Sequence, residues 1–451
     1  MQLISEFKPL VKLAWPLLIA QLTQMLMSVS DTIMAGRVSP TDMAGVAIAA
    51  SIFLPITIFI QGVIMAVPPI ISRLDGGKLH KKIPEAGQQA FWLALMISIP
   101  VACANGLTYD LLGLIDMEIP LRNVAAEYLQ YVLVCVPAFA LYQVFRQYCE
   151  GMSITKPSMI IMGIGLLINI PANYVFIYGE LGVPAYGGAG CGIASALVFV
   201  IMMISTWLYV RFADKLRHVC FFSSMYKPRW EGIKEILHLG IPIALALLFE
   251  VTLFSVVAIL LSPLGPKVVA AHQIALNFSG LLFMIPLSIG FATTIRIGNL
   301  LGDGQPLRAQ HAAHSAILLG LILATFNATV SIVFKTQIAQ LYTEEKMVIE
   351  MAADLLMLAA VFQFSDAAQV ISGCALRGYK DTKAMFYITL TTYWGVGLTS
   401  GYLLALTDII IPALGAAGFW IGFIVGLTSA GILLTARMLI IQKRHFQLQP
   451  A

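Results

Sequence analysis

The sequence contains few charged residues. Of its 451 residues, 11% are Asp, Glu, Lys or Arg and 59% are hydrophobic, whereas a soluble domain typically has about 25% charged and about 45–50% apolar residues. A surface that faces water needs more charge than this, so the composition excludes a soluble globular protein, and it also excludes a disordered chain. The remaining class is a polytopic membrane protein, whose partner is the lipid bilayer.

Motifs of several other classes are also lacking. The six cysteines form no CxxC pair and no cluster with histidine, which predicts neither a disulfide nor a structural metal. The sequence has no Walker A motif and no nucleophile–base arrangement, so we expect no ATP-driven pump, no enzyme and no cofactor. The net charge of +4 comes from scattered residues and gives no indication of nucleic-acid binding.

Long hydrophobic runs are what the sequence does have. A helix needs about 20 apolar residues to cross the hydrocarbon core of a bilayer, and these runs do not alternate in polarity as β-barrel strands do. We therefore predict an all-α polytopic membrane protein with twelve transmembrane helices. They lie near residues 9–36, 44–72, 88–108, 124–145, 157–178, 190–210, 236–262, 269–295, 312–334, 352–376, 384–406 and 409–436.

Basic residues indicate the orientation of these spans. With twelve spans and a cytoplasmic N-terminus, 22 of the 27 Lys and Arg residues fall on the cytoplasmic side, where such residues normally concentrate. We expect a multi-pass protein of the cytoplasmic (inner) membrane with both termini in the cytoplasm. The five basic residues on the other side are Arg37, Arg122, Lys267, Lys335 and Lys346.

The two halves of the chain resemble each other. Pro16 aligns with Pro242 at an offset of 226 residues, and Lys156 aligns with Lys383 at an offset of 227. Each half has six spans that start on the same side, so the halves are parallel repeats related by a pseudo-two-fold axis along the membrane normal. We predict two six-helix lobes and a cytoplasmic linker, at residues 1–210, 236–451 and 211–235, respectively.

Three carboxylates lie within the predicted spans, where ionisable groups are costly and usually functional. Glu250 and Asp366 lie near mid-depth in different spans, and no Lys or Arg shares that depth. They must therefore be protonated, share a proton or bind a cation. Asp31 lies nearer the outer end of the first span. The alternative for each is a protonated, hydrogen-bonded carboxylate with a structural role.

Two asparagines share one face of the fifth predicted span. Asn169 and Asn173 are four residues apart, and Pro171 between them predicts a kink that frees a backbone carbonyl. They are candidates for a polar site, and hydrogen bonding between helices is the alternative.

The repeat is asymmetric at the carboxylates. Glu250 aligns with Gln24 and Asp366 aligns with Phe139, so the first half lacks this carboxylate pair. The counterpart of Asp31 in the second half is Val257. We therefore expect two different sites, one in each half.

The stretches around these polar residues are characteristic. They read SVSDTIMAGRVSP around Asp31, LLFEVTLFSVVA around Glu250, FQFSDAAQVISGCALRGYKDT around Asp366, and INIPANYVFIYG followed by GGAGCGIASA in the fifth and sixth spans. Together they resemble the multidrug and toxic compound extrusion (MATE) family, most closely its NorM-like branch. The resemblance runs through both halves.

This resemblance implies a secondary-active antiporter. It would export cationic, amphipathic drugs and dyes in exchange for Na⁺ or H⁺ by alternating access, with small-molecule organic cations as its partners and a monomer as the functional form. Glu250 and Asp366 match the cation-coupling carboxylates, which would hold the metal ion Na⁺. Asp31, Asn169 and Asn173 match the polar cluster that serves as the substrate or proton site.

Two points stay open in this interpretation. Relatives often carry Tyr where this chain has Phe362, so one hydroxyl ligand of the cation is missing here. The alternative function is a flippase for a lipid-linked oligosaccharide or another amphipathic lipid. A flippase must hold a pyrophosphate and should place Lys or Arg in its cavity, whereas the mid-depth charges here are acidic. A channel would need a filter loop, and no stretch of the sequence resembles one.

Overall fold

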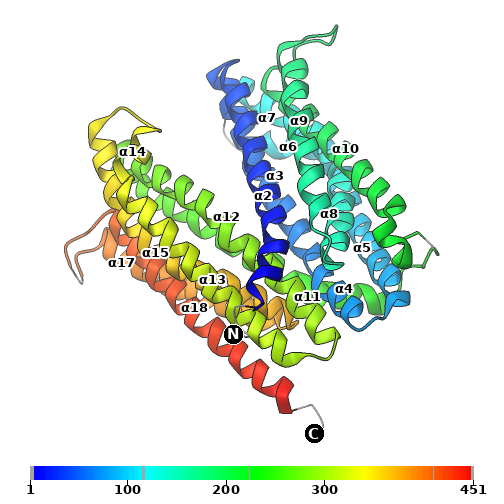
Figure 1. The fold of residues 1–451 in the computed structure, drawn as a ribbon. Helices are drawn as coiled ribbons and strands as arrows, with labels where there is room; N and C mark the ends of the chain where they lie inside the picture. The colour runs from blue at the N-terminus through cyan, green and yellow to red at the C-terminus, as the bar shows by residue number, and fades with distance from the viewer. Residues whose placement is uncertain (1–4, 114–116, 223, 410, 448–451) are drawn as a thin grey trace. The chain divides into compact units, whose positions relative to one another are not determined.

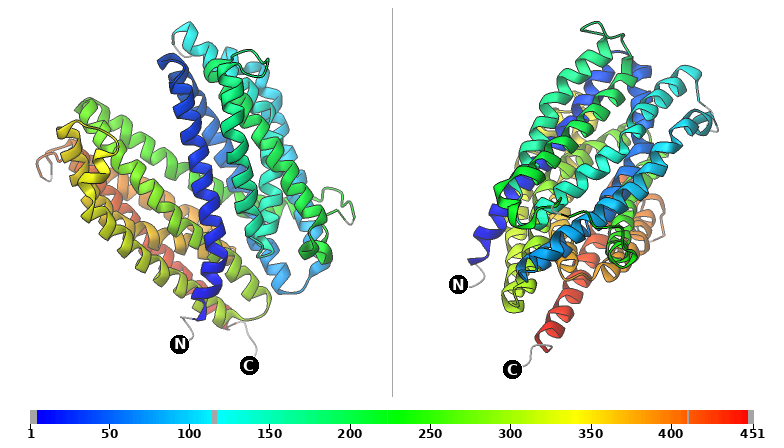
Figure 2. Two further views of the ribbon diagram at one scale, coloured as in Figure 1. Left: turned by 45° about the horizontal axis from the view of Figure 1, so that its top comes forward. Right: turned by 90° about the vertical axis from the view of Figure 1, so that its right-hand side faces the viewer.

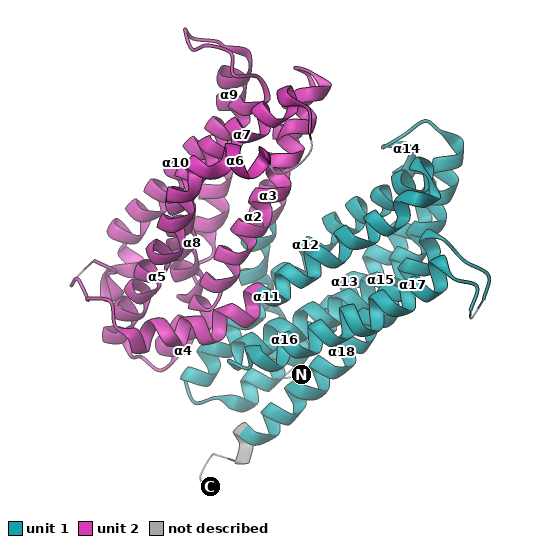
Figure 3. Cartoon of the chain, turned by 180° about the vertical axis from the view of Figure 1, so that it is seen from behind, with its two compact units in different colours: residues 1–18, 245–451 teal, residues 19–244 magenta. Residues whose placement is uncertain are grey.

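The structure, a computed structural model, describes residues 5–113, 117–222, 224–409 and 411–447. All elements within these ranges are helical (Figure 1). Contacts between residues divide the chain into two compact units, which Figure 3 shows in different colours. We name Ile19–Ala244 the N-terminal unit, and Met1–Leu18 together with Leu245–Ala451 the C-terminal unit.

The N-terminal unit is a bundle in which α8 packs against both α5 and α10, and α9 lies beside α10 (Figure 2). Its core includes the buried side chains of Val63, Phe139 and Phe145. Its α-helices are α2 (Phe7–Gly36, in part), α3 (Pro40–Ile64), α4 (Val67–Gly76), α5 (Ile83–Cys103), α6 (Thr108–Gly113), α7 (Ile119–Val134), α8 (Val136–Gly151), α9 (Lys156–Tyr178) and α10 (Gly190–Phe212). Short 3₁₀ turns connect them at η1 (His80–Lys82), η2 (Ala104–Leu107), η3 (Gly187–Ala189) and η4 (Asp214–Val219).

The C-terminal unit is arranged around one helix, α15, which packs against α12, α13 and α18. The elements of this unit are α11 (Trp230–Leu261, in part), η5 (Ser262–Leu264), α12 (Pro266–Gly302), α13 (Pro306–Val333), α14 (Lys335–Gln340), α15 (Lys346–Gly378), α16 (Thr382–Leu390), the π-helical stretch η6 (Thr391–Leu398), α17 (Thr399–Leu406) and α18 (Ala416–Gln447).

Two helices change unit part-way along their length. The first turns of α2 pack in the C-terminal unit, where Leu10 and Ala14 share a core cluster with Ile289. Conversely, the first turns of α11 pack in the N-terminal unit. There Gly240 approaches α3 so closely that a Cβ atom would lie 2.3 Å from the carbonyl oxygen of Val63, so only glycine fits.

The observed units therefore differ from the lobes predicted at residues 1–210 and 236–451. The predicted linker, 211–235, and the start of α11 belong to the N-terminal unit, whereas the start of α2 belongs to the C-terminal unit. Hydropathy identifies a span but does not report which neighbours it packs against, so this exchange left no signal in the sequence.

Helices coincide with all twelve predicted spans. Ten pass as apolar spans by length and composition, and α7 with α8 forms one more, bent by 48°. Pro137 lies in the first turn of α8 and has no N–H to donate, which accounts for the bend. The remaining span, predicted at 384–406, is the continuous series α16, η6 and α17. The two-lobe, twelve-helix fold class is thus confirmed.

One boundary was predicted wrongly. The last span does not begin at residue 409, since α18 starts only at Ala416. The residues between 409 and 416 are apolar, but two of them prevent a helix. Pro412 has no backbone N–H to donate, and Gly415 has a φ of 57°, which lies outside the right-handed helical region. Residue 410 lies outside the described residues.

Large apolar side chains are exposed along several spans. Leu167 is 73% exposed, Ile259 69% and Phe326 66%. A soluble protein would bury most residues of this kind in its core, so these positions fit a surface covered by lipid chains. The chain is a multi-pass membrane protein.

Candidate functional site

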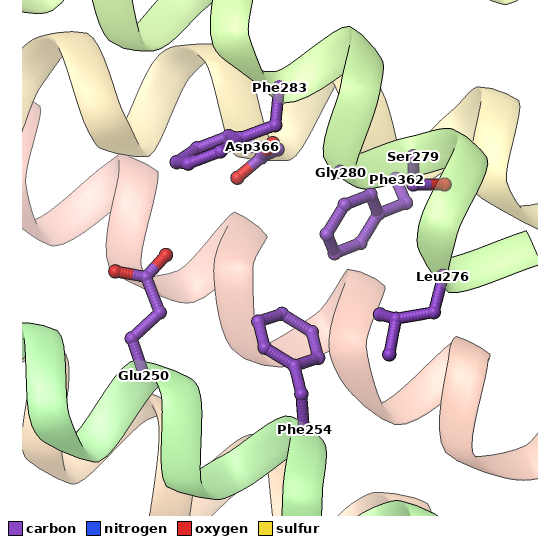
Figure 4. A pocket seen from close by; sticks show the side chains of 8 residues that line it. All are labelled: Glu250, Phe254, Leu276, Ser279, Gly280, Phe283, Phe362 and Asp366. Atoms are coloured by element: carbon purple, nitrogen blue, oxygen red, sulfur yellow. The ribbon is translucent and has the colours of Figure 1, made fainter. Parts of the chain in front are cut away.

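Glu250 and Asp366 line one cavity of the C-terminal unit. Glu250 lies on α11 and Asp366 on α15, and Figure 4 shows both carboxylates directed into the same space. The volume of this cavity is about 210 Å³, and the rest of its lining is largely apolar. The other lining residues are Phe254, Leu276, Ser279, Gly280, Phe283 and Phe362.

The surrounding helices fix both carboxylates in place. Because α15 is packed on three sides, Asp366 is only 5% exposed, and its Oδ1 accepts a hydrogen bond from Gln369 Nε2 at 3.3 Å. On α11, the carbonyl oxygen of Phe249, directly before Glu250, accepts a hydrogen bond from Trp394 Nε1 at 3.1 Å. Trp394 belongs to the π-helical stretch η6, and such stretches frequently occur at functional sites.

No Lys or Arg forms an ion pair with either carboxylate among the residues that the structure describes. Arg377 lies 11 residues, or about 16 Å, beyond Asp366 along α15, and its charge acts on Glu250 without forming an ion pair. Two carboxylates in an apolar cavity disfavour each other's ionised form. Glu250 and Asp366 can therefore share a proton or bind a cation, as expected from the sequence.

A second, smaller cavity adjoins Asp366. Its volume is about 10 Å³, close to the space of one water molecule. Asn327 and Gln363 contribute polar groups to it. The Nε2 atom of Gln363 donates to Ser331 Oγ at 2.9 Å, whereas its Oε1 atom is buried without a hydrogen-bond partner. Sequence analysis missed both amides, because a single amide in an apolar span is also common in helix packing.

Asp31 is the centre of a polar cluster in the N-terminal unit. Its Oδ1 atom accepts hydrogen bonds from Asn169 Nδ2 at 3.0 Å and from Asn173 Nδ2 at 2.6 Å. Both asparagines are fully buried, and Asn173 also donates to Asn169 Oδ1 at 3.2 Å. The structure thus brings together all three residues singled out in the first half. Helix α9 continues through Pro171.

Two further residues of α10 complete this cluster. Ser195 Oγ lies 3.5 Å from Asp31 Oδ2, and Cys191 Sγ contacts the backbone oxygen of Asp31 at 3.6 Å. Both residues lie in the GGAGCGIASA stretch, which was noted as a motif without assigning contacts to its members. Small side chains at these positions let α10 approach α2, which is a packing effect that sequence alone does not report.

The same stretch anchors the loop between α2 and α3. The backbone N–H of Gly188 donates to Asp42 Oδ1 at 2.6 Å, and the hydroxyl of Ser39 accepts from the N–H of Asp42 at 3.0 Å. Gly187, beside it, has a φ of 57°. Two separate motifs of the sequence therefore meet at this end of the N-terminal unit, next to the Asp31 cluster.

Comparisons with known proteins identify the family of the chain. A sequence model of the MatE family matches residues 16–175 and 242–403, and the two starts differ by the 226-residue repeat offset. The chain is 47% identical over 445 residues to multidrug resistance protein NorM of Vibrio vulnificus (strain YJ016), covering 99% of this chain and 98% of NorM. It is 48% identical over 442 residues to multidrug resistance protein MdtK of Yersinia pseudotuberculosis, covering 98% and 97%.

The fold has solved counterparts as well. The crystal structure of the eukaryotic MATE transporter AtDTX14 superposes with a TM-score of 0.88 at 20% identity, covering 99% of both chains. At this identity the likeness shows the fold alone, whereas the sequence matches to NorM and MdtK extend over nearly the whole chain. The chain therefore belongs to the MatE family of multidrug efflux transporters.

Proposed function

We propose that this protein exports cationic, amphipathic drugs and dyes in exchange for Na⁺, or alternatively H⁺, by alternating access. The observation that carries the proposal is the pair Glu250 and Asp366 in one largely apolar cavity, with no ion pair to Lys or Arg among the described residues. The names of its relatives, multidrug resistance proteins NorM and MdtK, support the substrate class.

Na⁺ is the preferred coupling ion in this proposal. Carboxylate and amide oxygens are ligands that suit a hard cation, and Asn327 and Gln363 lie beside Asp366. A bound Na⁺ supplies the positive charge that two neighbouring carboxylates lack. Protonation of the pair would achieve the same neutrality, which makes H⁺ the alternative.

The Asp31 cluster is the proposed substrate or proton site. Its carboxylate carries the one formal charge of the cluster, and Asn169 and Asn173 hold it in a fixed orientation. An ionised Asp31 would attract an organic cation, and protonation would remove that attraction. Both sites are formed within a single chain, so the proposed functional form is a monomer.

The available driving force is sufficient. Each positive charge that moves inward gains about 2.3 kcal/mol per 100 mV, and each tenfold concentration ratio contributes about 1.4 kcal/mol. Exchange of one Na⁺ for one monovalent drug cation cancels the electrical term and leaves the concentration terms. Coupling also requires that the cation bind one conformation more tightly than the other, since otherwise it shifts no equilibrium.

The test is drug efflux from proteoliposomes that contain the purified full-length protein. One sample carries only a Na⁺ gradient and another only a pH gradient, with a cationic dye as the substrate. We expect efflux under the Na⁺ gradient. Efflux under the pH gradient alone would identify H⁺ as the coupling ion. Absence of efflux under both would contradict the antiport mechanism.

The proposed location is the cytoplasmic (inner) membrane, with both termini in the cytoplasm. The distribution of Lys and Arg supports this orientation. External thiol labelling of single-cysteine variants tests it. Cysteines at Thr41 and Glu345 should react from outside, whereas cysteines at Lys81 and Lys227 should not. Labelling of the second pair from outside would reverse the orientation.

A further inference from the structure

Two histidines and an aspartate form a cluster in the N-terminal unit, separate from both carboxylate sites. Asp75 lies in the last turn of α4, His80 begins η1, and His218 lies in η4. One ligand atom from each residue lies within 4.8 Å of the ligand atoms of the other two. His80 and His218 are far apart in sequence, so the cluster joins the α4–α5 loop to the segment that follows α10.

The backbone holds the cluster in place. After α4, the N–H of Gly77 donates to the Arg73 carbonyl at 3.1 Å, and Lys78 has a φ of 55°, which turns the chain so that His80 lies beside Asp75. On the other side, the hydroxyl of Tyr148 donates to the carbonyl of Val219 at 2.6 Å. Both segments are therefore anchored close to the residues that supply the ligand atoms.

The side chains of the cluster suit a transition metal. The imidazole rings of His80 and His218 are 5.0 Å apart, centroid to centroid, and meet edge to face. The Nδ1 atom of His80 is buried and has no hydrogen-bond partner, a costly state that metal coordination would relieve. Two imidazoles and one carboxylate are a typical ligand set for Zn²⁺ with an open fourth position.

The distances permit coordination after small side-chain movements. A triangle whose sides do not exceed 4.8 Å has a central point about 2.8 Å or less from every corner, and Zn–N and Zn–O bonds are about 2.0–2.2 Å. Each ligand atom must therefore move by less than about 1 Å. His218 is exposed, so rotation of its side chain meets little resistance. We propose that Asp75, His80 and His218 bind a Zn²⁺ ion that fastens the segment after α10 to the α4–α5 loop.

The charge around the cluster makes this proposal selective. Lys78, Lys81 and Lys82 are neighbours of His80 in the sequence, and Arg217 precedes His218. A cation that binds only through long-range attraction is repelled by these groups. Binding therefore depends on direct coordination by the imidazole nitrogens, which favour Zn²⁺ over Mg²⁺ or Ca²⁺.

The experiment is isothermal titration of the full-length protein in detergent with Zn²⁺ alone, using a purification tag without histidines. We expect one Zn²⁺ per chain for the wild type and no binding of Mg²⁺. His80→Asn and His218→Asn should each lower the Zn²⁺ affinity by roughly tenfold or more. The matched control is His238→Asn, which removes an exposed histidine outside the cluster and should leave the affinity unchanged.

A second measurement tests whether Zn²⁺ holds the segment after α10 in place. Trypsin cleavage at Lys215 and Arg217, in the same 3₁₀ turn as His218, should slow when Zn²⁺ is added to the wild type and should not change in His218→Asn. Because His218 is exposed, its replacement leaves the fold intact, which an unchanged melting temperature in the absence of metal verifies. A wild type that binds no Zn²⁺, or a His218→Asn variant with wild-type affinity, would overturn the proposal.

Discussion

The two units carry carboxylates in opposite environments. Asp31 in the N-terminal unit has its oxygens near three side-chain donors, those of Asn169, Asn173 and Ser195. In the C-terminal unit, Asp366 accepts one long side-chain hydrogen bond, from Gln369, within an aromatic cavity that Glu250 shares. Asp31 thus receives its hydrogen bonds from side chains of its own unit, whereas Glu250 and Asp366 direct carboxylate oxygens into the cavity, where a ligand can bind them.

The difference shows how one repeated fold provides two kinds of site. The counterpart of Asp366 in the first half is Phe139, which is 4% exposed and packs edge to face on Phe199 with ring centroids 5.1 Å apart. Conversely, the counterpart of Asp31 is Val257, which is fully buried. At these two positions each half therefore has apolar core where the other carries a carboxylate. The Asp31 carboxylate, held by its hydrogen bonds, suits an organic cation. The Glu250 and Asp366 pair, which has few hydrogen-bond donors, suits a small inorganic cation.

The largest expected effect comes from removing the pair. In the double variant Glu250→Gln and Asp366→Asn, Na⁺ should no longer stimulate efflux, because no charge remains to bind the ion. Coupling free energies of about 1–3 kcal/mol correspond to roughly 5- to 150-fold effects, so we expect a loss near the upper end. The measurement is dye release from proteoliposomes on addition of external Na⁺.

The repeat supplies a matched control for this experiment. Gln24 is the counterpart of Glu250 and is exposed in the N-terminal unit. Gln24→Ala should retain most of the Na⁺ stimulation. If the double variant still released dye in response to Na⁺ as the wild type does, the coupling site would have to lie elsewhere, and the contrast between the two units would lose its functional meaning.

A smaller effect is expected at the satisfied carboxylate. Asp31→Asn removes the charge but keeps an oxygen that can accept from Asn173, so the fold should persist. Efflux of a cationic dye should fall by roughly tenfold or more, since the proposed attraction for the organic cation disappears. The measurement is efflux at matched membrane expression, with Ser195→Ala as the milder control because its contact is 3.5 Å long. Wild-type efflux by Asp31→Asn would reduce this residue to a structural role.

The exchange of helix segments between the units predicts a third, pH-dependent effect. Glu6, just before α2, is 2% exposed and pairs with Arg296 at 2.8 Å and Arg308 at 3.0 Å, all in the C-terminal unit. Burial alone would raise the pKa of Glu6, but the hydrogen bonds and charges of the two arginines outweigh it and hold the pKa below its ordinary value of 4.5. The ionised form therefore stabilises the folded unit.

Replacement by glutamine should lower stability by about 1–2 kcal/mol, because Arg308 is half exposed and its interaction is screened. Since the pKa is lowered on folding, the stabilisation is complete above about pH 4.5 and is lost as the pH falls through the folded-state pKa. The melting temperatures of wild type and Glu6→Gln should thus differ at pH 7, and the difference should shrink as the pH falls below about 4.5. A constant difference at all pH values would assign the effect to packing.

Much of this contrast was predictable from the sequence, for a physical reason. Hydropathy and charge identify segments that cross a membrane, so the twelve spans followed directly from the sequence, and Glu250 and Asp366 were recognised as carboxylates within two of them. The spacing of Asn169 and Asn173 predicted a shared helix face, whereas their association with Asp31 was implied by the family resemblance.

Lateral packing was not predictable in the same way. The contacts of Ser195 and Cys191 with Asp31 depend on how closely α10 approaches α2. Likewise, the amides Asn327 and Gln363 gain significance only because α13 and α15 place them beside Asp366. A lone polar residue in an apolar span is compatible with many neighbours, and only the packed structure selects among them.

The smallest expected effect sharpens the description of the C-terminal cavity. Phe362 lies one turn before Asp366 on α15, is 5% exposed, and lines the cavity with its ring 5.6 Å from that of Trp420. Phe362→Tyr adds a hydroxyl that has room in the cavity and can act as a further oxygen ligand for Na⁺. One such interaction contributes about 0.5–1.5 kcal/mol net, so the Na⁺ concentration for half-maximal efflux should fall by roughly 2- to 10-fold.

The control is Phe423→Tyr. It adds the same hydroxyl to a buried ring that packs on Phe362 with centroids 6.4 Å apart, but Phe423 does not line the cavity, so the change should not improve Na⁺ affinity. An unchanged Na⁺ dependence in Phe362→Tyr would mean that the two carboxylates and the neighbouring amides already complete the shell around the ion.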